Sequence, residues 1–411
     1  MNYAPITEIK VSLDFGEKKI IPVGRLAIRN HQIYFEYDLS FLKNALPISP
    51  LKLPVEPGLK IADRNLFEGL PGLFYDSLPD GWGRLLLDRL LRQQNILPNI
   101  LTPLDRLAHV GTTGMGALIY EPDLHDKIKI KKMNLDYLAL HSQKILDGEA
   151  DNILQTLLAL NGSSAGARPK IMIGVDRDKK NIVYGAHALP KKYMPWMVKF
   201  PNIIDGHDAG AIEYIYSLMA REAGLTMTDT HLFSTKKSAY FATKRFDRDH
   251  QKRIHVHTAA GLLHVDFRTP SLDYQDLLSL TEVLTRDHRE VEKMYRQAVF
   301  NVLSHNRDDH AKNFSFLMNE QGEWILSPAY DLTFSSGLGG EQSTTVFGKG
   351  KNIILADLKK LGLQIKLDNK IIQNIIAQTK DALSQWKRFA KQYDVNVSNV
   401  KLIQKQLDSI L

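Results

Sequence analysis

The residues of this sequence best suited to chemistry are two carboxylates and a side-chain amide in its last third. Asp308 stands five residues before Asn313, and Asp331 follows eighteen residues later, in the polar break at residues 327–331 (SPAYD). A phosphoryl-transfer site needs such groups, because one carboxylate orients the attacking hydroxyl while an amide and a second carboxylate hold Mg²⁺ on nucleotide phosphates. The spacing therefore predicts phosphoryl transfer, if other segments supply a cation and a phosphate-binding loop.

A lysine and a glutamate earlier in the chain could supply that cation. Lys199 lies in the apolar strand pattern WMVKFP, and Glu213 follows fourteen residues later in a segment with helical spacing. A lysine on an edge strand can simply extend into solvent. In protein kinases, however, a Lys–Glu pair that joins a strand to a helix holds the lysine on the nucleotide phosphates.

The small-residue segment at residues 161–170 (NGSSAGARPK) is suited to cover phosphates with backbone N–H groups. It follows a helical pattern and precedes a strand pattern, which is the reverse of a Walker nucleotide site and argues against that class. A plain turn is the alternative. Ser163 and Ser164 offer hydroxyls at the crown of the loop. A phosphoryl group there would add roughly −1.5 to −2 charges beside the nucleotide phosphates, so we expect an off-switch.

The organisation of the chain predicts an α/β (α+β) protein with three parts. Residues 1–122 form a small α/β unit, residues 123–246 a sheet-bearing lobe with the loop and the lysine, and residues 247–411 a mainly helical lobe. In the middle part we expect a polar connector at 122–148, helices at 149–160 and 211–223, and strands near 171–175, 182–186, 196–200, 230–235 and 239–244.

The composition is that of an ordinary globular chain. Its 411 residues are 44% hydrophobic and 24% charged, with a net charge of +7 and no cysteine. The lack of thiols excludes disulfides and cysteine nucleophiles. Because no apolar run is long enough to span a membrane and the first residues lack a signal-peptide pattern, we expect a cytoplasmic protein. The positive charge alone identifies no partner.

Two other functions compete with phosphoryl transfer. His305, His310, Asp308 and Asp309 could be the metal ligands of a phosphohydrolase. The chain could also be a catalytically inactive binding partner that acts as a co-repressor on DNA. The order of loop, strand lysine, helix glutamate, connector, Asp-x4-Asn and later Asp favours a bilobal protein-kinase-like fold.

Five motifs in this order resemble the HipA-like serine/threonine kinases, the toxin components of bacterial type II toxin–antitoxin systems. They are SSAGARPK, WMVKFP, KRFDR, DDHAKNFS and SPAYDL, and LPDGWGR resembles the N-terminal part of that family. The resemblance implies ATP and Mg²⁺ as cofactors, Asp308 as the catalytic residue, Asn313 and Asp331 as metal ligands, and Glu213 as the partner of Lys199. The ATP-binding residues that it implies are Ser164, Ala165, Gly166, Ala167, Lys199, Arg245, Phe246, Asp247 and His310.

The resemblance also implies regulation and partners. Ser163 or Ser164 would be the autophosphorylation site, an aminoacyl-tRNA synthetase the protein substrate, and a small helix-turn-helix antitoxin the partner that brings operator DNA. Two positions depart from some members, since Lys244 replaces an acidic residue and Asp309 a small one. Asp308 is preferred over Asp309 because only Asp308 lies five residues before Asn313.

Overall fold

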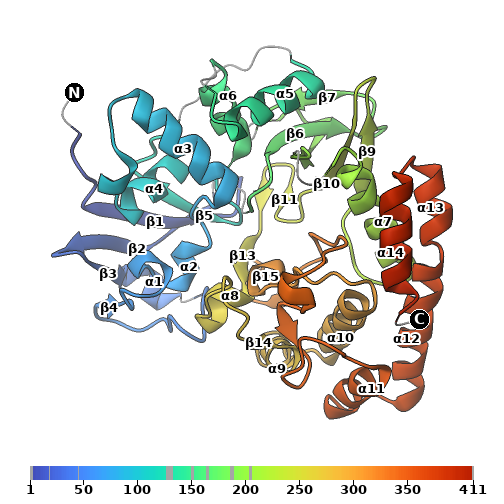
Figure 1. Cartoon of the computed structure of the whole chain (residues 1–411). Coiled ribbons are helices and arrows are strands. Elements are labelled where there is room, and N and C mark those ends of the chain that lie inside the picture. Colours follow the sequence, from blue (N-terminus) through green and yellow to red (C-terminus); the bar gives the residue numbers. More distant parts are fainter. Residues whose placement is uncertain are drawn as a thin grey trace.

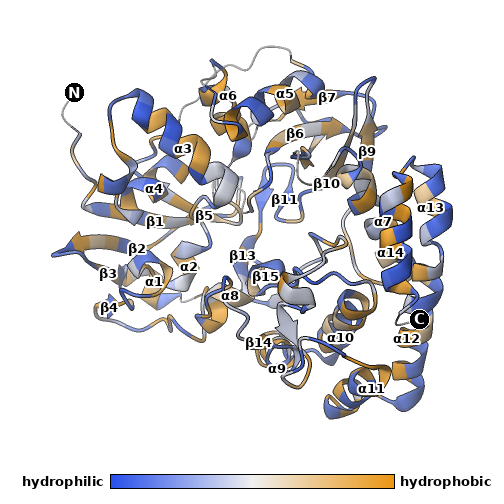
Figure 2. Ribbon diagram, in the orientation of Figure 1, coloured by the Kyte–Doolittle hydropathy of each residue, from blue (hydrophilic) through white to orange (hydrophobic). Residues whose placement is uncertain are grey.

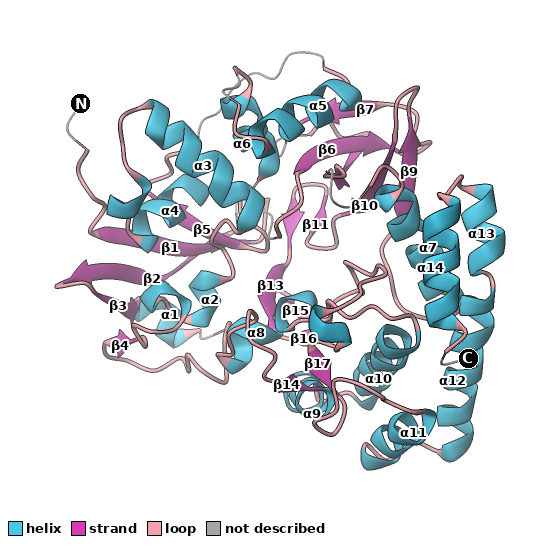
Figure 3. Cartoon of the chain, viewed as in Figure 1, coloured by secondary structure: helices cyan, strands magenta, loops and turns pink. Residues whose placement is uncertain are grey.

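Two five-stranded antiparallel sheets and a helical C-terminal region build this chain (Figures 1 and 3). The computed structural model describes residues 3–17, 19–44, 46–125, 133–149, 152–162, 166–185, 189–202 and 206–409. The first sheet and its helices come from the N-terminal part, the second sheet from the middle part, and the remaining helices from the C-terminal part. The predicted α/β, bilobal kinase-like fold with an N-terminal α/β subdomain is confirmed.

The N-terminal sheet forms because its strands alternate apolar and polar residues. In β1, Ile9, Val11 and Leu13 are buried while the residues between them are more exposed, which is the pattern of a sheet with one face on the core. The strand order is β4 (Lys60–Ile61), β3 (Gln32–Tyr37), β2 (Ile20–Arg29), β1 (Glu8–Asp14) and β5 (Leu118–Glu121). The accompanying helices are α1 (Leu39–Lys43), α2 (Gly72–Tyr75), α3 (Gly81–Gln93) and α4 (Pro103–Val110).

The second sheet carries the predicted lysine at the end of a central strand. Its order is β7 (Ile182–Tyr184), β6 (Lys170–Asp176), β8 (Tyr193–Lys199), β10 (Ala239–Lys244) and β9 (Thr230–Ser234). Strand β6 is buried along almost its whole length, and α6 (Leu154–Asn161) packs against it. Helix α7 (Ala209–Glu222) packs on β10 and β9. Gly210 permits that approach, because a Cβ there would lie 2.7 Å from the carbonyl oxygen of Ala239.

For the segment before this sheet, one prediction was wrong, and the other was right about the helix but not about its start. The polar stretch expected to be a connector contains helix α5 (Leu135–Leu146), which buries Leu135, Leu138 and Ile145. The helix expected at 149–160 begins at Leu154 and ends at Asn161. Gly162 follows in the left-handed conformation (φ +54°), which ends the helix and starts the loop.

The C-terminal part is mainly helical with short strand pairs. Its helices are α8 (Ala259–Leu263), α9 (Tyr274–Thr285), α10 (His288–Leu303), α11 (Leu355–Gln364), α12 (Asn369–Ser384), α13 (Trp386–Gln392) and α14 (Val397–Leu407). The helices carry hydrophobic residues along one side and hydrophilic residues along the other (Figure 2), the pattern of helices packed on a core. The strands are β13 (His255–Thr258), β15 (Ser315–Met318) and β16 (Trp324–Leu326) in one sheet, and the pairs β11 (Arg248–Asp249) with β12 (Lys252–Arg253) and β14 (Leu272–Asp273) with β17 (Thr344–Thr345).

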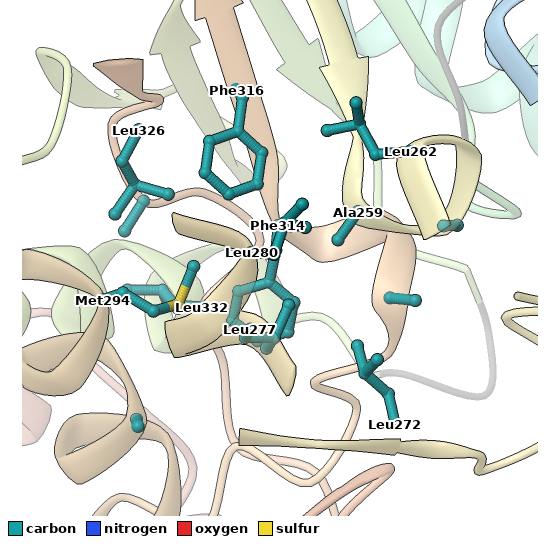
Figure 4. Close-up of a cluster of buried hydrophobic side chains, with 14 of the residues drawn as sticks. Ala259, Leu262, Leu272, Leu277, Leu280, Met294, Phe314, Phe316, Leu326 and Leu332 are labelled. Atoms are coloured by element: carbon teal, nitrogen blue, oxygen red, sulfur yellow. The ribbon is translucent and has the colours of Figure 1, made fainter. Parts of the chain in front are cut away.

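A hydrophobic cluster in this part (Figure 4) includes the residues that directly follow two of the predicted site residues. Phe314, which is 1% exposed, directly follows Asn313, and Leu332, which is 3% exposed, directly follows Asp331. Both side chains belong to the cluster formed by α8, α9, α10, β15 and β16. Because close-packed cores hold side chains in fixed positions, this burial fixes the backbone from which Asn313 and Asp331 project.

Candidate active site

Lys199 contacts two other predicted site residues at the boundary between the second sheet and the helical part. The Lys199 Nζ donates to Glu213 Oε1 at 2.6 Å and to Asp331 Oδ1 at 2.5 Å. The lysine and glutamate side chains are 12% and 3% exposed, whereas that of Asp331 is 41% exposed. One lysine on β8 therefore links a glutamate on α7 to a carboxylate that follows β16 by a few residues.

The charges in this group stabilise one another. Burial by itself lowers the pKa of Lys199, but Asp331 and Glu213 outweigh burial and raise that pKa above its ordinary value. Burial raises the pKa of Asp331, yet the charge of Lys199 and its hydrogen bond hold that pKa well below the usual range. For Glu213 burial dominates, so its pKa is raised despite Lys199. At neutral pH Lys199 is charged and Asp331 is ionised.

Asp331 occupies an unusual backbone position. Its φ is +56°, in the left-handed region that few residues other than glycine adopt and that aspartate and asparagine tolerate best. The backbone on either side is fixed, because the Ala329 N–H donates to the Thr226 carbonyl at 2.8 Å and Leu332 is buried in the cluster. The turn thus directs the Asp331 carboxylate to Lys199.

The loop that follows α10 presents Asp308 to solvent and buries its neighbour. Asp308 is exposed, whereas Asp309 is 1% exposed. The Asn313 Nδ2 donates to the Asp308 carbonyl at 2.7 Å, which fixes the five-residue spacing as a closed turn. Burial and the negative charge of Asp331 raise the pKa of Asp308, and His310 partly offsets that rise. The two aspartates therefore have different surroundings.

Asp309 is bound by hydrogen bonds on both oxygens. Its Oδ1 accepts from the backbone N–H groups of Ser343 and Thr344, and its Oδ2 accepts from the Tyr274 hydroxyl and the Gln342 amide. Burial raises its pKa to about 6. These bonds join the loop to the segment near β17, so Asp309 has a structural role.

The arrangement does not favour the phosphohydrolase ligand set. His305 Nε2 contacts the Gln406 carbonyl at 2.8 Å, and Asp309 faces β17. His310 packs against Phe267, with ring centroids 5.3 Å apart. Within the ranges that the structure describes, no three His, Cys, Asp or Glu residues are grouped as metal ligands. Of the four residues proposed for that metal site, Asp308 interacts electrostatically with Lys199 and Asp331, and His310 interacts with Asp308.

The small-residue loop lies next to the N-terminal unit. Ser163, Ser164 and Ala165 lie outside the described residues. Beyond them, the Trp82 N–H donates to the Gly166 carbonyl at 3.2 Å. A Cβ on Gly81 would lie 2.5 Å from the Ala167 Cα. The start of α3 therefore packs directly on the loop, so the predicted loop residues Gly166 and Ala167 are held by the N-terminal subdomain.

Two cations of this loop were missed as site residues. Lys170 on β6 lies directly opposite Lys199 on β8 in the strand register, and Lys170 is 4% exposed. Burial, and then the charge of Lys199, lower the pKa of Lys170 to about 8. Arg168 Nη1 lies 3.8 Å from Glu213 Oε2. The signal was in the sequence, because both residues lie in the loop segment SSAGARPK.

A further missed pair joins the N-terminal unit to the catalytic loop. The Lys312 Nζ donates to Asp80 Oδ2 at 3.2 Å and lies over the rings of Tyr75 and Phe267, at 4.6 and 4.4 Å from their centroids. Asp80 also caps α3 by accepting from the Gly81 N–H. The pattern LPDGWGR marked this segment, but no spacing rule connects it with residue 312.

The connector residues have different environments. Arg245 donates to both oxygens of Asp247, which is 0% exposed and also accepts from Arg248 and from the Gly116 N–H. Both of these predicted ATP-binding side chains are engaged in a buried ion cluster with the loop at 111–116. Phe246 is half-buried and lies 5.4 Å from the Tyr330 ring. An adenine contact from this stretch would come from the backbone or from Phe246.

Comparison with known proteins identifies the family. The model of the HipA-like C-terminal domain matches residues 162–386, and that of the HipA N-terminal domain matches residues 19–121. The chain belongs to the HipA family of toxin–antitoxin kinases.

Individual relatives agree with this assignment. The Sinorhizobium fredii protein named "Putative kinase Y4mE" is 25% identical over 388 residues, which cover 87% of each chain. A second protein of that organism, "Putative kinase Y4dM", is 24% identical over 275 residues, covering 61% of this chain and 64% of the other. HipA of Shewanella oneidensis MR-1, solved with HipB and its operator DNA, has the same fold, with a TM-score of 0.68 and 17% identity over 97% of this chain and 95% of that one.

In the described part of this chain, no helix is long and apolar enough to cross a membrane.

The residues present fit a nucleotide with Mg²⁺. Mg²⁺ prefers oxygen ligands, commonly one or two carboxylates together with phosphates and water. Asp331 offers a carboxylate, and Asn313 uses its amide nitrogen for the Asp308 carbonyl, which leaves its oxygen as the end that can bind a cation. Lys170 lies directly opposite Lys199 on the neighbouring strand, so two cations near Asp331 suit an anionic ligand such as a phosphate.

Proposed function

We propose that this chain is an ATP- and Mg²⁺-dependent protein serine/threonine kinase. The observation that carries the proposal is the contact of Lys199 with both Glu213 and Asp331, beside a loop that exposes Asp308 and turns Asn313 toward it. These residues arrive from four separate segments of the chain. The kinase-like fold and the family membership support the same activity.

Each side chain has a defined task in this proposal. Asp308 accepts a hydrogen bond from the acceptor hydroxyl and can take its proton, a role for which a pKa above the ordinary value is an advantage. Lys199, held by Glu213, would bind phosphate oxygens together with Lys170. Asn313 and Asp331 would hold Mg²⁺, which when bound supplies positive charge to the phosphates. The backbone of the loop around Gly166 would cover them.

We further propose that the kinase is a growth-inhibiting toxin. A HipA protein with the same fold is found with HipB and operator DNA, which supports a small helix-turn-helix antitoxin as partner and operator DNA through it. The resemblance of the motifs supports an aminoacyl-tRNA synthetase as substrate, and such a substrate places the activity in the cytoplasm.

Incubation of the purified protein with γ-labelled ATP and Mg²⁺ tests the activity. We expect label in protein, on the chain itself or on an added synthetase. Label released only as free phosphate would instead show a phosphohydrolase. No turnover with retained binding to an antitoxin would show an inactive partner protein.

The Lys170 ammonium makes nucleotide binding dependent on pH. Because its pKa in the free protein is about 8 and bound phosphates favour the charged form, affinity should be constant below pH 8 and fall above it, by at most about tenfold per pH unit. Lys170→Arg keeps the charge throughout this range. Titration with a fluorescent ATP analogue from pH 6.5 to 9.5 should therefore show a fall for the native protein and a flat profile for the variant. Parallel profiles would contradict a phosphate contact of Lys170.

Autophosphorylation in the small-residue loop is the proposed off-switch. Ser163→Ala together with Ser164→Ala should abolish self-labelling, because no acceptor hydroxyl remains in the loop. Ser163→Ala alone should leave the initial rate on another protein close to native. Label incorporated by the double variant at the native level would place the modification elsewhere. The single variants then distinguish which serine accepts the phosphoryl group.

A further inference from the structure

The loop that follows Asp331 presents one strongly exposed leucine beside the catalytic loop. Leu338 is 91% exposed, more than any other large hydrophobic residue of the described ranges. Single exposed leucines are common on protein surfaces. Leu338 differs from such residues in its position beside the catalytic loop and in its fixed backbone.

Both ends of the segment at 335–343 are bonded to the residues that flank Asp308. At the first end, the Ser335 N–H donates to the His305 carbonyl at 3.0 Å. The Arg307 Nη1 donates to the Ser336 carbonyl, also at 3.0 Å. At the second end, the Ser343 N–H donates to the Arg307 carbonyl at 3.1 Å. Leu338 is two residues from Ser336, so its Cα lies within roughly 7 Å of that anchor.

Glycines shape the tip into a tight turn. Gly337, Gly339 and Gly340 have φ values of +68°, +60° and +80°. A Cβ on Gly337 would lie 2.2 Å from the Glu341 carbonyl oxygen and 2.9 Å from the Arg307 Cβ, so this position packs against the residue before Asp308 and requires glycine. The Glu341 N–H closes the turn on the Leu338 carbonyl at 3.1 Å. An apolar group held in a hydrogen-bonded turn loses little entropy when it binds.

We propose that Leu338 is a docking residue for the polypeptide of the protein substrate. It contacts an apolar side chain near the serine that is phosphorylated, and the loop thereby places that serine at Asp308. The proposal rests on the kinase activity proposed above and specifies how that activity selects a protein. It commits to a substrate segment that bears an apolar residue close to its acceptor serine.

Leu338→Ser and the control Leu39→Ser test the proposal. Leu39 is also a strongly exposed leucine (76%), but it begins α1 of the N-terminal unit. Each protein is incubated with γ-labelled ATP, Mg²⁺ and a bacterial cell extract, and label on other proteins is measured relative to self-label. We expect Leu338→Ser to lower the rate on other proteins by about tenfold or more, the effect of losing one buried leucine contact, with self-labelling unchanged and Leu39→Ser native.

A serine-centred peptide library gives the second readout. The native protein should prefer apolar residues at one flanking position, and Leu338→Ser should lose that preference. Equal labelling of extract proteins by Leu338→Ser and the native protein would overturn the docking role. A loss of self-label in Leu338→Ser as large as its loss of label on other proteins would also overturn it, because phosphoryl transfer itself would then be impaired. If Leu338→Ser changed the oligomeric state, the residue would belong to a contact between copies. If the native protein labelled nothing, the kinase activity itself would fail.

Discussion

Replacement of Asp308 with asparagine is expected to lower phosphoryl transfer by roughly 10²- to 10⁴-fold, the contribution of a general base. The amide keeps the size of the carboxylate but cannot take the proton of the acceptor hydroxyl. Because Asp308 is exposed and its backbone carbonyl, not its carboxylate, bonds Asn313, the turn should survive the change. Initial rates of labelling from γ-labelled ATP measure the loss, and binding of a fluorescent ATP analogue should remain within a few-fold of native.

Asp309→Asn is the matched control, one residue away. Its side chain replaces an oxygen that accepts hydrogen bonds with an NH₂ group. In either orientation of the amide, that NH₂ group faces one pair of donors, either the N–H groups of Ser343 and Thr344 or the side chains of Tyr274 and Gln342. We expect a loss of roughly 1–3 kcal/mol in the free energy of unfolding, measured by denaturant titration, with transfer by the remaining folded protein much less affected than in Asp308→Asn. An Asp309→Asn protein that is stable but inactive, beside an active Asp308→Asn, would reverse the assignment of the two aspartates.

The second large effect is expected from Lys199→Met. Methionine keeps the apolar stem but leaves Glu213, only 3% exposed, without its lysine and removes the cation beside Asp331. Removal of one partner of a buried ion pair costs about 3–5 kcal/mol. The variant should unfold at lower denaturant concentration and should bind the ATP analogue far more weakly.

Lys19→Met tests whether loss of any ion pair would do the same. Lys19 pairs with Glu320 at the surface and is 64% exposed, so the change should alter the free energy of unfolding by no more than about 1 kcal/mol. A second variant, Lys199→Met with Glu213→Gln, should recover part of the stability but none of the affinity. Native affinity in Lys199→Met would show that the lysine is structural only.

The parts of the site that could be predicted from the sequence are those set by local patterns. Lys199 is at the end of an apolar strand and Glu213 is in an amphipathic helix, and the structure brings the two together. The Asp-x4-Asn spacing corresponds to a closed turn between Asp308 and Asn313. Helix α5 was missed because the basic run at residues 127–132 led the whole stretch to be interpreted as polar, although Leu135, Leu138 and Ile145 are spaced for one helix face. The domain boundaries and the ligand contacts stay predictions.

Pairings between distant segments could not be predicted. Asp309 is buried by donors at residues 342–344, and no local rule separates it from Asp308. Lys312 pairs with Asp80, which lies 232 residues away in the chain. Lys170 faces Lys199 through the register of β6 and β8, which depends on the packing of the whole sheet. Arg245 and Asp247 matched a motif, but a loop of the N-terminal unit buries their side chains.

A crystal structure with a non-hydrolysable ATP analogue and Mg²⁺ most directly tests the shared nucleotide site of Lys199, Asn313 and Asp331. We expect the phosphates of the analogue against Lys199 and the metal between Asn313 and Asp331, with the end of the phosphate chain facing Asp308. An analogue bound at another surface, or one that leaves the contact between Lys199 and Asp331 unchanged, would contradict the account.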